Sequence, residues 1–284
     1  MTATTGSATS TPTAPTALDP WATDAAAGRR GRFLHGLNPL AKLAAPMPAM
    51  ILLVFARDLA TPLAFFAVTS LVLLAGARVT PRLTLLLFVA LPLGAAVIGL
   101  SMSVWIDASR VDTSVTLVQL GGWSLYGGAV VVGMATGVRL AAIVGLALIA
   151  GLTSTGPDLV RAAVQQLRVP YRIGYTALAA FRFVPRFAYE LEVIRQAHRV
   201  RGASGGRGPF AALARWWGYI VPLLAGAIRH AERVALAMDA RAFGAYPDRT
   251  ERHLVPWRVR DTAFVLAFWA VSAGILIAFF PWTL

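Results

Sequence analysis

Long apolar stretches alternate with short polar or basic connections along most of this chain of 284 residues. Five stretches are apolar enough, and long or nearly long enough, to cross a hydrocarbon core, which needs about 20 helical residues. They cover residues 40–56, 61–77, 83–105, 128–153 and 262–282. The first two form a closely spaced pair and are short for a full crossing. The pattern predicts an all-α integral membrane protein with about five transmembrane helices.

A different pattern fills residues 156–260, where apolar residues recur at helical spacing and arginines interrupt them every few positions. Such a pattern is typical of amphipathic helices at an interface, because the arginine stem lies along apolar surface while the guanidinium stays in water. Residues 216–228 form an apolar run too short for a full span, which favours a buried or partly inserted helix. Pro185 and Pro222 should kink the helices that contain them. We expect long cytoplasmic amphipathic helices here.

The chain divides by composition into four parts. They are a disordered tail (1–30), N-terminal transmembrane helices (31–155), a cytoplasmic, interfacial coupling-helix region (156–260) and a C-terminal transmembrane helix (261–284). The tail is rich in Ser, Thr, Pro and Ala and cannot bury enough apolar surface to fold alone. Asn38 should cap a helix that starts with Pro39, and Pro157 indicates another helix start.

The charge distribution indicates the topology and excludes one class of partner. A net charge of +13 could suggest nucleic acid, but 17 of the 26 Lys and Arg fall between Arg161 and Arg260. By the positive-inside rule the N-terminus and residues 156–260 are cytoplasmic, whereas the loop 106–122 is outside. Part of this basic charge is expected to face anionic lipid. Arginine far outnumbers lysine, which is typical of a GC-rich bacterial genome, so we predict a multi-pass bacterial plasma membrane protein that binds no nucleic acid.

Reactive groups for an enzyme are not gathered in this sequence. Cysteine is absent, which excludes disulfides and thiolate metal sites, and the four histidines lack the spacing of a zinc protease. Asp107 and Asp112 lie in the external loop without further acidic residues beside them. No phosphate-binding loop of the Walker type occurs, so any ATP would be bound by another subunit. The sequence predicts a non-catalytic chain with no cofactor and no metal site.

Two arginines, Arg201 and Arg241, each close a helix-compatible stretch that opens with a glutamate. The stretches match at the same offsets: Glu192 corresponds to Glu232, Ala197 to Ala237 and Arg201 to Arg241. A small residue one turn before an arginine lets a partner surface approach while the guanidinium reaches a carboxylate. An arginine at a helix end can also serve as a cap for free carbonyls or as a lipid contact. Both interpretations remain open from spacing alone.

The chain resembles, over about residues 33–282, the transmembrane T component of energy-coupling factor (ECF) transporters, the EcfT/CbiQ family. Two Ala-Arg-Gly triplets of that family are matched by Val200-Arg201-Gly202 and Ala240-Arg241-Ala242. Further matches are Leu37-Asn38-Pro39 with Lys42, the turn at 153–160, and Phe181-Arg182-Phe183-Val184-Pro185. Val200 and Ala242 depart from the family pattern. Since alanine resists the left-handed conformation, we expect the second helix end to shift toward Gly244.

The resemblance implies that the chain joins two cytoplasmic ATPases of the ABC type to a membrane-embedded S component, which captures a vitamin or metal ion. Arg201 and Arg241 would each enter a groove on one ATPase. Their neighbours would complete the two coupling ends, namely Ala197, Val200, Gly202, Ala237, Ala240 and Ala242. Large apolar residues that could contact the S component are Leu159, Val160, Leu167, Tyr175, Phe181, Phe183, Trp216, Trp217 and Tyr219.

Arg139 lies inside the fourth apolar stretch, where a charge is costly and usually faces protein or water. We expect it to pair with a backbone carbonyl or with Asp158 and to have a structural role. The alternative function is a conventional permease or channel that conducts substrate through its own helices. That class needs polar groups facing a cavity at mid-membrane, and the stretches offer little beyond Arg139.

Overall fold

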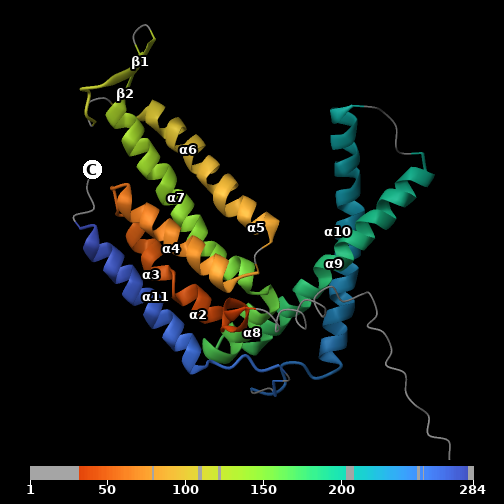
Figure 1. The fold of residues 1–284 in the computed structure, drawn as a ribbon. Coiled ribbons are helices and arrows are strands. Elements are labelled where there is room, and N and C mark those ends of the chain that lie inside the picture. The colour runs from red at the N-terminus through yellow and green to blue at the C-terminus, as the bar shows by residue number, and fades with distance from the viewer. Residues whose placement is uncertain are drawn as a thin grey trace, which may run out of the picture. The chain divides into compact units, whose positions relative to one another are not determined.

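The computed structural model describes residues 32–78, 80–107, 111–120, 123–202, 208–247, 250–251 and 253–280, so the predicted tail lies outside the described residues. Helices make up most of the described chain (Figure 1). They form two compact units. The first contains described residues within 32–37, 46–153 and 267–280, and the second contains residues within 38–45 and 154–266.

The first unit begins with a 3-10 turn, η1 (Phe33–Gly36), and two short helices, α3 (Met47–Leu53) and α4 (Ala60–Gly76). Leu34 of η1 is fully buried and packs where Gly76 ends α4, because a side chain at Gly76 would overlap it. The guanidinium of Arg32 donates to the carbonyl oxygens of Leu74 (2.6 Å) and Ala77 (2.8 Å). These bonds satisfy carbonyls that the end of α4 leaves free.

The stretch expected at 40–56 is divided in the structure. Its first part is α2 (Pro39–Ala44), which belongs to the second unit, and α3 starts anew after Pro46. A proline lacks the N–H that an uninterrupted helix needs at this position, so the break follows from the sequence. As predicted, Asn38 caps α2, because its side-chain oxygen accepts the N–H of Leu40 at 2.9 Å.

Three helices are long and apolar enough to cross a membrane. They are the continuous helix Pro81–Trp105, α7 (Gly127–Thr153) and α11 (Val259–Ala278). Pro81–Trp105 consists of α5 (Pro81–Leu85), a π-helical turn η2 (Leu86–Ala90) and α6 (Leu91–Trp105). The π turn ends two residues before Pro92, which cannot donate to an i−4 carbonyl. These elements confirm an all-α membrane protein, in which the two N-terminal apolar stretches are shorter than a full span.

Small residues bring α6 and α7 into close contact. A side chain added at Gly133 would overlap Ser103 and the carbonyl of Gly99, and one added at Gly137 would overlap the carbonyl of Ala95. Packing of this kind replaces the hydrophobic effect between helices in lipid, because close backbone approach maximises van der Waals contact. The signal in the sequence is the Gly-x-x-x-Gly spacing of Gly133 and Gly137.

A small antiparallel hairpin connects α6 to α7, and the sequence analysis did not anticipate it. Strand β1 (Thr116–Leu120) pairs with β2 (Trp123–Tyr126), with an irregularity between Thr116 and Val118. Just before the hairpin, Asp112 accepts the N–H of Ser114 at 2.9 Å, and this bond lowers the pKa of its carboxyl. The Gly-Gly pair between the two strands is a sequence signal for such a hairpin.

The second unit contains α8 (Gly156–Gln166), α9 (Tyr171–Val200) and α10 (Pro209–Asp239). The start of α8 is as predicted, since Thr155 caps it by accepting the N–H of Asp158. Both α9 and α10 run without a break through their internal prolines, so the kinks at Pro185 and Pro222 stay a prediction.

Helices α9 and α10 pack against each other in an antiparallel sense. The rings of His198 and Tyr219 lie 5.3 Å apart near the end of α9, whereas Phe183 stacks on His230 at 4.5 Å further back along it. Residues nearer the N-terminus of α9 therefore contact residues nearer the C-terminus of α10. Figure 1 shows the two helices crossing, with their C-terminal ends on opposite sides of the crossing.

A buried polar cluster joins the starts of α2 and α11 within the second unit. Asp261 is 1% exposed, and its two carboxylate oxygens accept the N–H groups of Asn38 and Arg258, both at 2.7 Å. Lys42 is also 1% exposed, and the charges of Asp158 and Asp261 act on its ammonium. The cluster fixes the first turn of α11 by a capping contact and ties it to the first turn of α2.

Candidate functional site

The end of α9 carries the first predicted arginine. Arg201 is the C-cap residue, and its N–H donates to the carbonyl of Ala197 at 3.1 Å. Gly202 follows with a φ of +70°, and its N–H donates to the carbonyl of Arg199 at 3.1 Å. A glycine in the left-handed conformation directly after the last helical turn is the common way to stop a helix.

The end of α10 has the same backbone construction around Arg241. Ala242 takes a φ of +53°, its N–H donates to the carbonyl of Asp239 at 2.9 Å, and the N–H of Phe243 donates to that of Met238 at 3.0 Å. These two bonds form a Schellman motif. Each arginine therefore directly precedes the left-handed residue, and the match in the sequence extends to the backbone.

The expected shift of the second helix end to Gly244 is wrong. Helix α10 ends at Asp239, and Ala242 adopts the left-handed conformation despite its side chain. The ring of Phe243, which follows, packs edge-on against Tyr171 with centroids 5.8 Å apart. Tyr171 belongs to α9, so this contact links the turn to the neighbouring helix. Gly244 also has a positive φ, of +90°, and continues the turn.

All eight residues predicted for the coupling ends are exposed. These are Ala197, Val200, Arg201, Gly202, Ala237, Ala240, Arg241 and Ala242. Val200 is 89% exposed, which is unusual for a branched apolar side chain. Within the described part of the chain, neither arginine side chain has a hydrogen bond or an ion pair. Both guanidinium groups are therefore available to another molecule.

The structure places the two ends far apart. Because α9 and α10 are antiparallel, their C-termini lie at opposite ends of the pair (Figure 1). Helix α9 alone has 30 residues, which corresponds to a length of about 45 Å. The two arginines are thus well separated and do not form one site.

The large apolar residues predicted to contact another membrane protein differ in exposure. Leu167, Phe181, Trp216 and Trp217 are exposed, whereas the others are partly buried. Some of the latter have partners within the chain. The hydroxyl of Tyr175 donates to Glu251 at 2.8 Å, Phe183 stacks on His230, and Tyr219 packs against His198.

Arg139 has the structural pairing that was expected. Its guanidinium donates to the carbonyl of Val54 and to the hydroxyl of Thr136, both at 3.1 Å. Val54 is the C-cap residue of α3, so Arg139 satisfies a carbonyl at a helix end. The alternative partner, Asp158, instead accepts from Thr155 and from Arg161, both at 2.8 Å.

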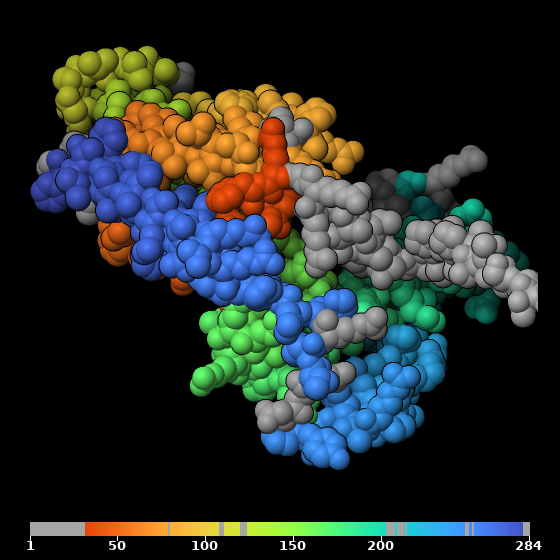
Figure 2. All heavy atoms as spheres, turned by 60° about the horizontal axis from the view of Figure 1, so that its bottom comes forward, coloured from red at the N-terminus to blue at the C-terminus, as the bar shows by residue number. Residues whose placement is uncertain are grey.

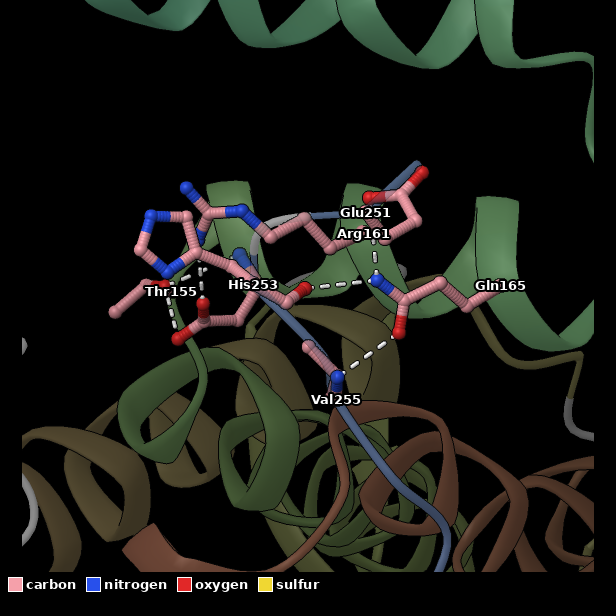
Figure 3. Close-up of polar contacts among 7 residues, drawn as sticks. Thr155, Arg161, Gln165, Glu251, His253 and Val255 are labelled. Atoms are coloured by element: carbon pink, nitrogen blue, oxygen red, sulfur yellow. Dashed lines mark hydrogen bonds and ion pairs between the residues drawn. The ribbon is translucent and has the colours of Figure 1, made fainter. Parts of the chain in front are cut away.

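A set of contacts around the segment that follows α10 was missed by sequence reasoning. The side-chain amide of Gln165 in α8 binds the backbone of this segment. It donates to the carbonyl of His253 and accepts the N–H of Val255, both at 2.8 Å (Figure 3). Gln166 donates to the carbonyl of Val255 at 2.7 Å. Figure 2 shows the blue atoms of this segment against the green atoms of α8. These partners are about 90 residues apart, so no local pattern could reveal them.

Among the described residues, no group of three or more His, Asp or Glu side chains could hold a metal ion. The chemistry of the described chain is instead that of exposed guanidinium groups on rigid helix ends. Such groups suit directional contacts with carboxylates.

A match to the model of a protein family decides to which family this chain belongs. The model of the cobalt transport protein CbiQ matches residues 30–252, which include both helix ends and most of the apolar helices. The chain belongs to the CbiQ family.

Several curated relatives of this CbiQ-family chain are transmembrane proteins. The energy-coupling factor transporter transmembrane protein EcfT of Thermotoga maritima is 35% identical over 44% of this chain and 48% of its own length. EcfT of Staphylococcus aureus is 27% identical over 81% of this chain and 87% of its own length. A putative ABC transporter ATP-binding protein of Bifidobacterium longum is 29% identical over 86% of this chain. The match spans about half of the Thermotoga relative and 31% of the Bifidobacterium relative.

Membership in this family and the three long apolar helices identify a transmembrane component of the energy-coupling factor type. The predicted resemblance to the transmembrane T component is thus confirmed.

Proposed function

We propose that this chain is the coupling subunit of an ECF-type ABC importer for a vitamin or a metal ion. Two cytoplasmic ATPases bind the turns at Arg201 and Arg241, one at each end of the α9 and α10 pair. A separate S component in the membrane binds the substrate. The chain itself carries no catalytic role, because ATP is hydrolysed by the partners.

The single observation that supports this proposal is the pair of equivalent helix ends at opposite ends of α9 and α10. Each presents an exposed arginine directly before a left-handed residue. Two copies of one ATPase, or two related ATPases, expose two equivalent grooves, and these need two equivalent contacts that are well separated. A guanidinium that enters a groove and meets a carboxylate gives a charge-assisted and directional contact.

The relatives add a second line of support. The Bifidobacterium relative is named as an ATP-binding protein, yet it contains a stretch similar to most of this chain. A chain of this kind inside a protein of that name favours direct association with an ABC ATPase.

The S component would bind exposed apolar surface on the amphipathic helices. On α10, Trp216, Trp217, Val221 and Leu224 are more than half exposed. Movement of the ATPases would change the position of α9 relative to α10. The exposed apolar surface would transmit this change to the S component. In the same proposal, the N-terminus and the second unit lie on the cytoplasmic side of the bacterial plasma membrane.

Arg201→Ala and Arg241→Ala should leave the protein inserted but weaken the binding of the ATPases. Truncating an arginine in a buried charge contact costs about 2 kcal/mol or more, which is a loss of more than tenfold in affinity. The measurement is the recovery of the ATPases with the tagged membrane protein in mild detergent. Lysine at either position should restore binding poorly, because it cannot reproduce the planar fork of the guanidinium.

The matched controls are Arg199→Ala on α9 and Arg233→Ala on α10, which remove exposed arginines of the same helices. These variants should retain the ATPases. Undiminished recovery with the double variant Arg201→Ala and Arg241→Ala would contradict the proposal. Substrate transport by the isolated chain in liposomes would instead support a conventional permease.

A further inference from the structure

The first turn of α9 contacts the turn that contains Arg241. The hydroxyl of Tyr171 donates to the carbonyl of Tyr246 at 2.6 Å, and the ring of Tyr171 packs against Phe243. The guanidinium of Arg172 donates to the carbonyl of Gly244. Three residues of the turn are thus held by two neighbouring side chains of α9.

Gly244 is suited to this contact in two ways. Its φ of +90° lies in a region that side-chain-bearing residues rarely adopt. A Cβ at this position would lie only 3.1 Å from Nε of Arg172. The glycine therefore allows both the direction of the chain and the close approach of the guanidinium.

Further contacts extend the same attachment along the chain. The hydroxyl of Tyr175, one turn further along α9, donates to Glu251 at 2.8 Å, and Gln165 of α8 binds the backbone at His253 and Val255. The segment after α10 is therefore fastened to the α8 and α9 side of the second unit at several successive points. Cooperation among such bonds holds a segment more firmly than one bond of about 1 kcal/mol could.

Helix α9 consequently connects the two arginine turns. Its last residues lead directly into Arg201, and its first residues bind the turn of Arg241. A continuous helix of 30 residues has a defined length of about 45 Å. One helix thereby fixes the spacing of the two turns, although they belong to different helix ends.

We propose that Tyr171 and Arg172 are positioning residues that hold the Arg241 turn on the first turn of α9, so that α9 sets the distance between the two coupling turns. The role of this distance in transport rests on the proposed function, in which the turns bind two ATPases. The contact itself belongs to this chain alone. It can therefore be tested without any partner.

The test uses the full chain in lipid nanodiscs. Because the sequence has no cysteine, the substitutions Gln196→Cys and Ala245→Cys introduce two unique sites for spin labels. Both positions are exposed, and neither belongs to the proposed coupling set. Double electron–electron resonance then measures the distance distribution between the end of α9 and the Arg241 turn. We expect a narrow distribution for the otherwise unchanged chain.

Tyr171→Phe combined with Arg172→Met should broaden this distribution or shift it, because both donors to the turn are lost while most of the side-chain volume is kept. Arg172→Lys in the chain with Tyr171 intact should keep the distribution narrow, since lysine can still donate to the carbonyl of Gly244. Arg182→Met is the matched control, because it removes another exposed arginine of α9. It should leave the distribution unchanged.

An unchanged distribution in the Tyr171→Phe and Arg172→Met variant would overturn the proposal. Equal broadening in the Arg182→Met control would do so as well, since the effect would then be unspecific. These distances are measured without ATPases. Failure of the positioning contact is therefore distinguishable from failure of ATPase binding at Arg201 and Arg241.

Discussion

Ala242 adopts a left-handed backbone that costs an alanine about 1 kcal/mol or more relative to glycine. The equivalent position after α9 is Gly202, which has the same conformation at no such cost. Nothing lies within 4 Å of a Cβ placed on Gly202, so an alanine there would meet the unfavourable backbone conformation but no clash. The two helix ends thus share a left-handed residue, but only the end after α10 places a side chain in that conformation.

Ala242→Gly should stabilise the turn after α10 by about 0.5–1 kcal/mol, because the relief of strain exceeds the added freedom of the unfolded chain. The amide of Phe243, which donates to Met238, should then exchange its hydrogen more slowly by a factor of about two to five. Hydrogen exchange followed by mass spectrometry measures this change.

The matched substitution Gly202→Ala should have the opposite sign and destabilise the turn after α9. If Ala242→Gly and Gly202→Ala changed the stability of their turns in the same direction, the alanine at 242 would not be strained.

Local signals explain which single residues were predictable. Asn38 and Thr155 were recognisable as helix starts, because a cap acts on backbone groups two or three residues away. The conformation of Ala242 was not, since alanine disfavours it and the neighbouring contact of Phe243 with Tyr171 is remote in sequence.

At the level of elements, small residues determine how closely α6 and α7 approach each other. Gly137→Ala should destabilise the first unit by about 1–3 kcal/mol, because its methyl group would overlap the carbonyl of Ala95 and push the helices apart. The measurement is the apparent midpoint of thermal unfolding in detergent. Gly151→Ala on the same helix is the control, because nothing lies within 4 Å of its added Cβ. Equal loss of stability in both variants would contradict a packing role for Gly137.

The apolar stretches predicted the long helices well, because lipid requires every backbone bond to be satisfied within the segment. The ends of Pro81–Trp105, α7 and α11 lie within a few residues of the expected ones. The break at Pro46 and the hairpin of β1 and β2 were not predicted, although proline and the Gly-Gly pair provided signals for them.

The polar cluster of the second unit is a property of the whole chain, since its members come from opposite parts of the sequence. Asp261→Asn should destabilise the protein by about 1–3 kcal/mol, because its amide keeps one oxygen to accept a backbone N–H and leaves the other of the two N–H groups, of Asn38 and Arg258, without an acceptor. The variant also removes one of the two negative charges that act on the buried ammonium of Lys42. Thermal unfolding in nanodiscs measures the loss.

The double variant Asp261→Asn with Lys42→Met should be more stable than the sum of the two single effects predicts, since the lost charge of Asp261 then no longer affects a buried ammonium. Strict additivity would show that the two residues do not interact.

The contact between Asn38 and Asp261 also concerns the order of synthesis. The two residues are 223 positions apart, so the acceptor for the backbone at the start of α2 is made only after this long intervening stretch has been translated. At a translation rate of about 5–20 residues per second the delay is on the order of ten seconds or more. During that time the earlier helices can insert, but the N–H of Asn38 lacks its final partner. The second unit is therefore completed only after its last segment has been translated.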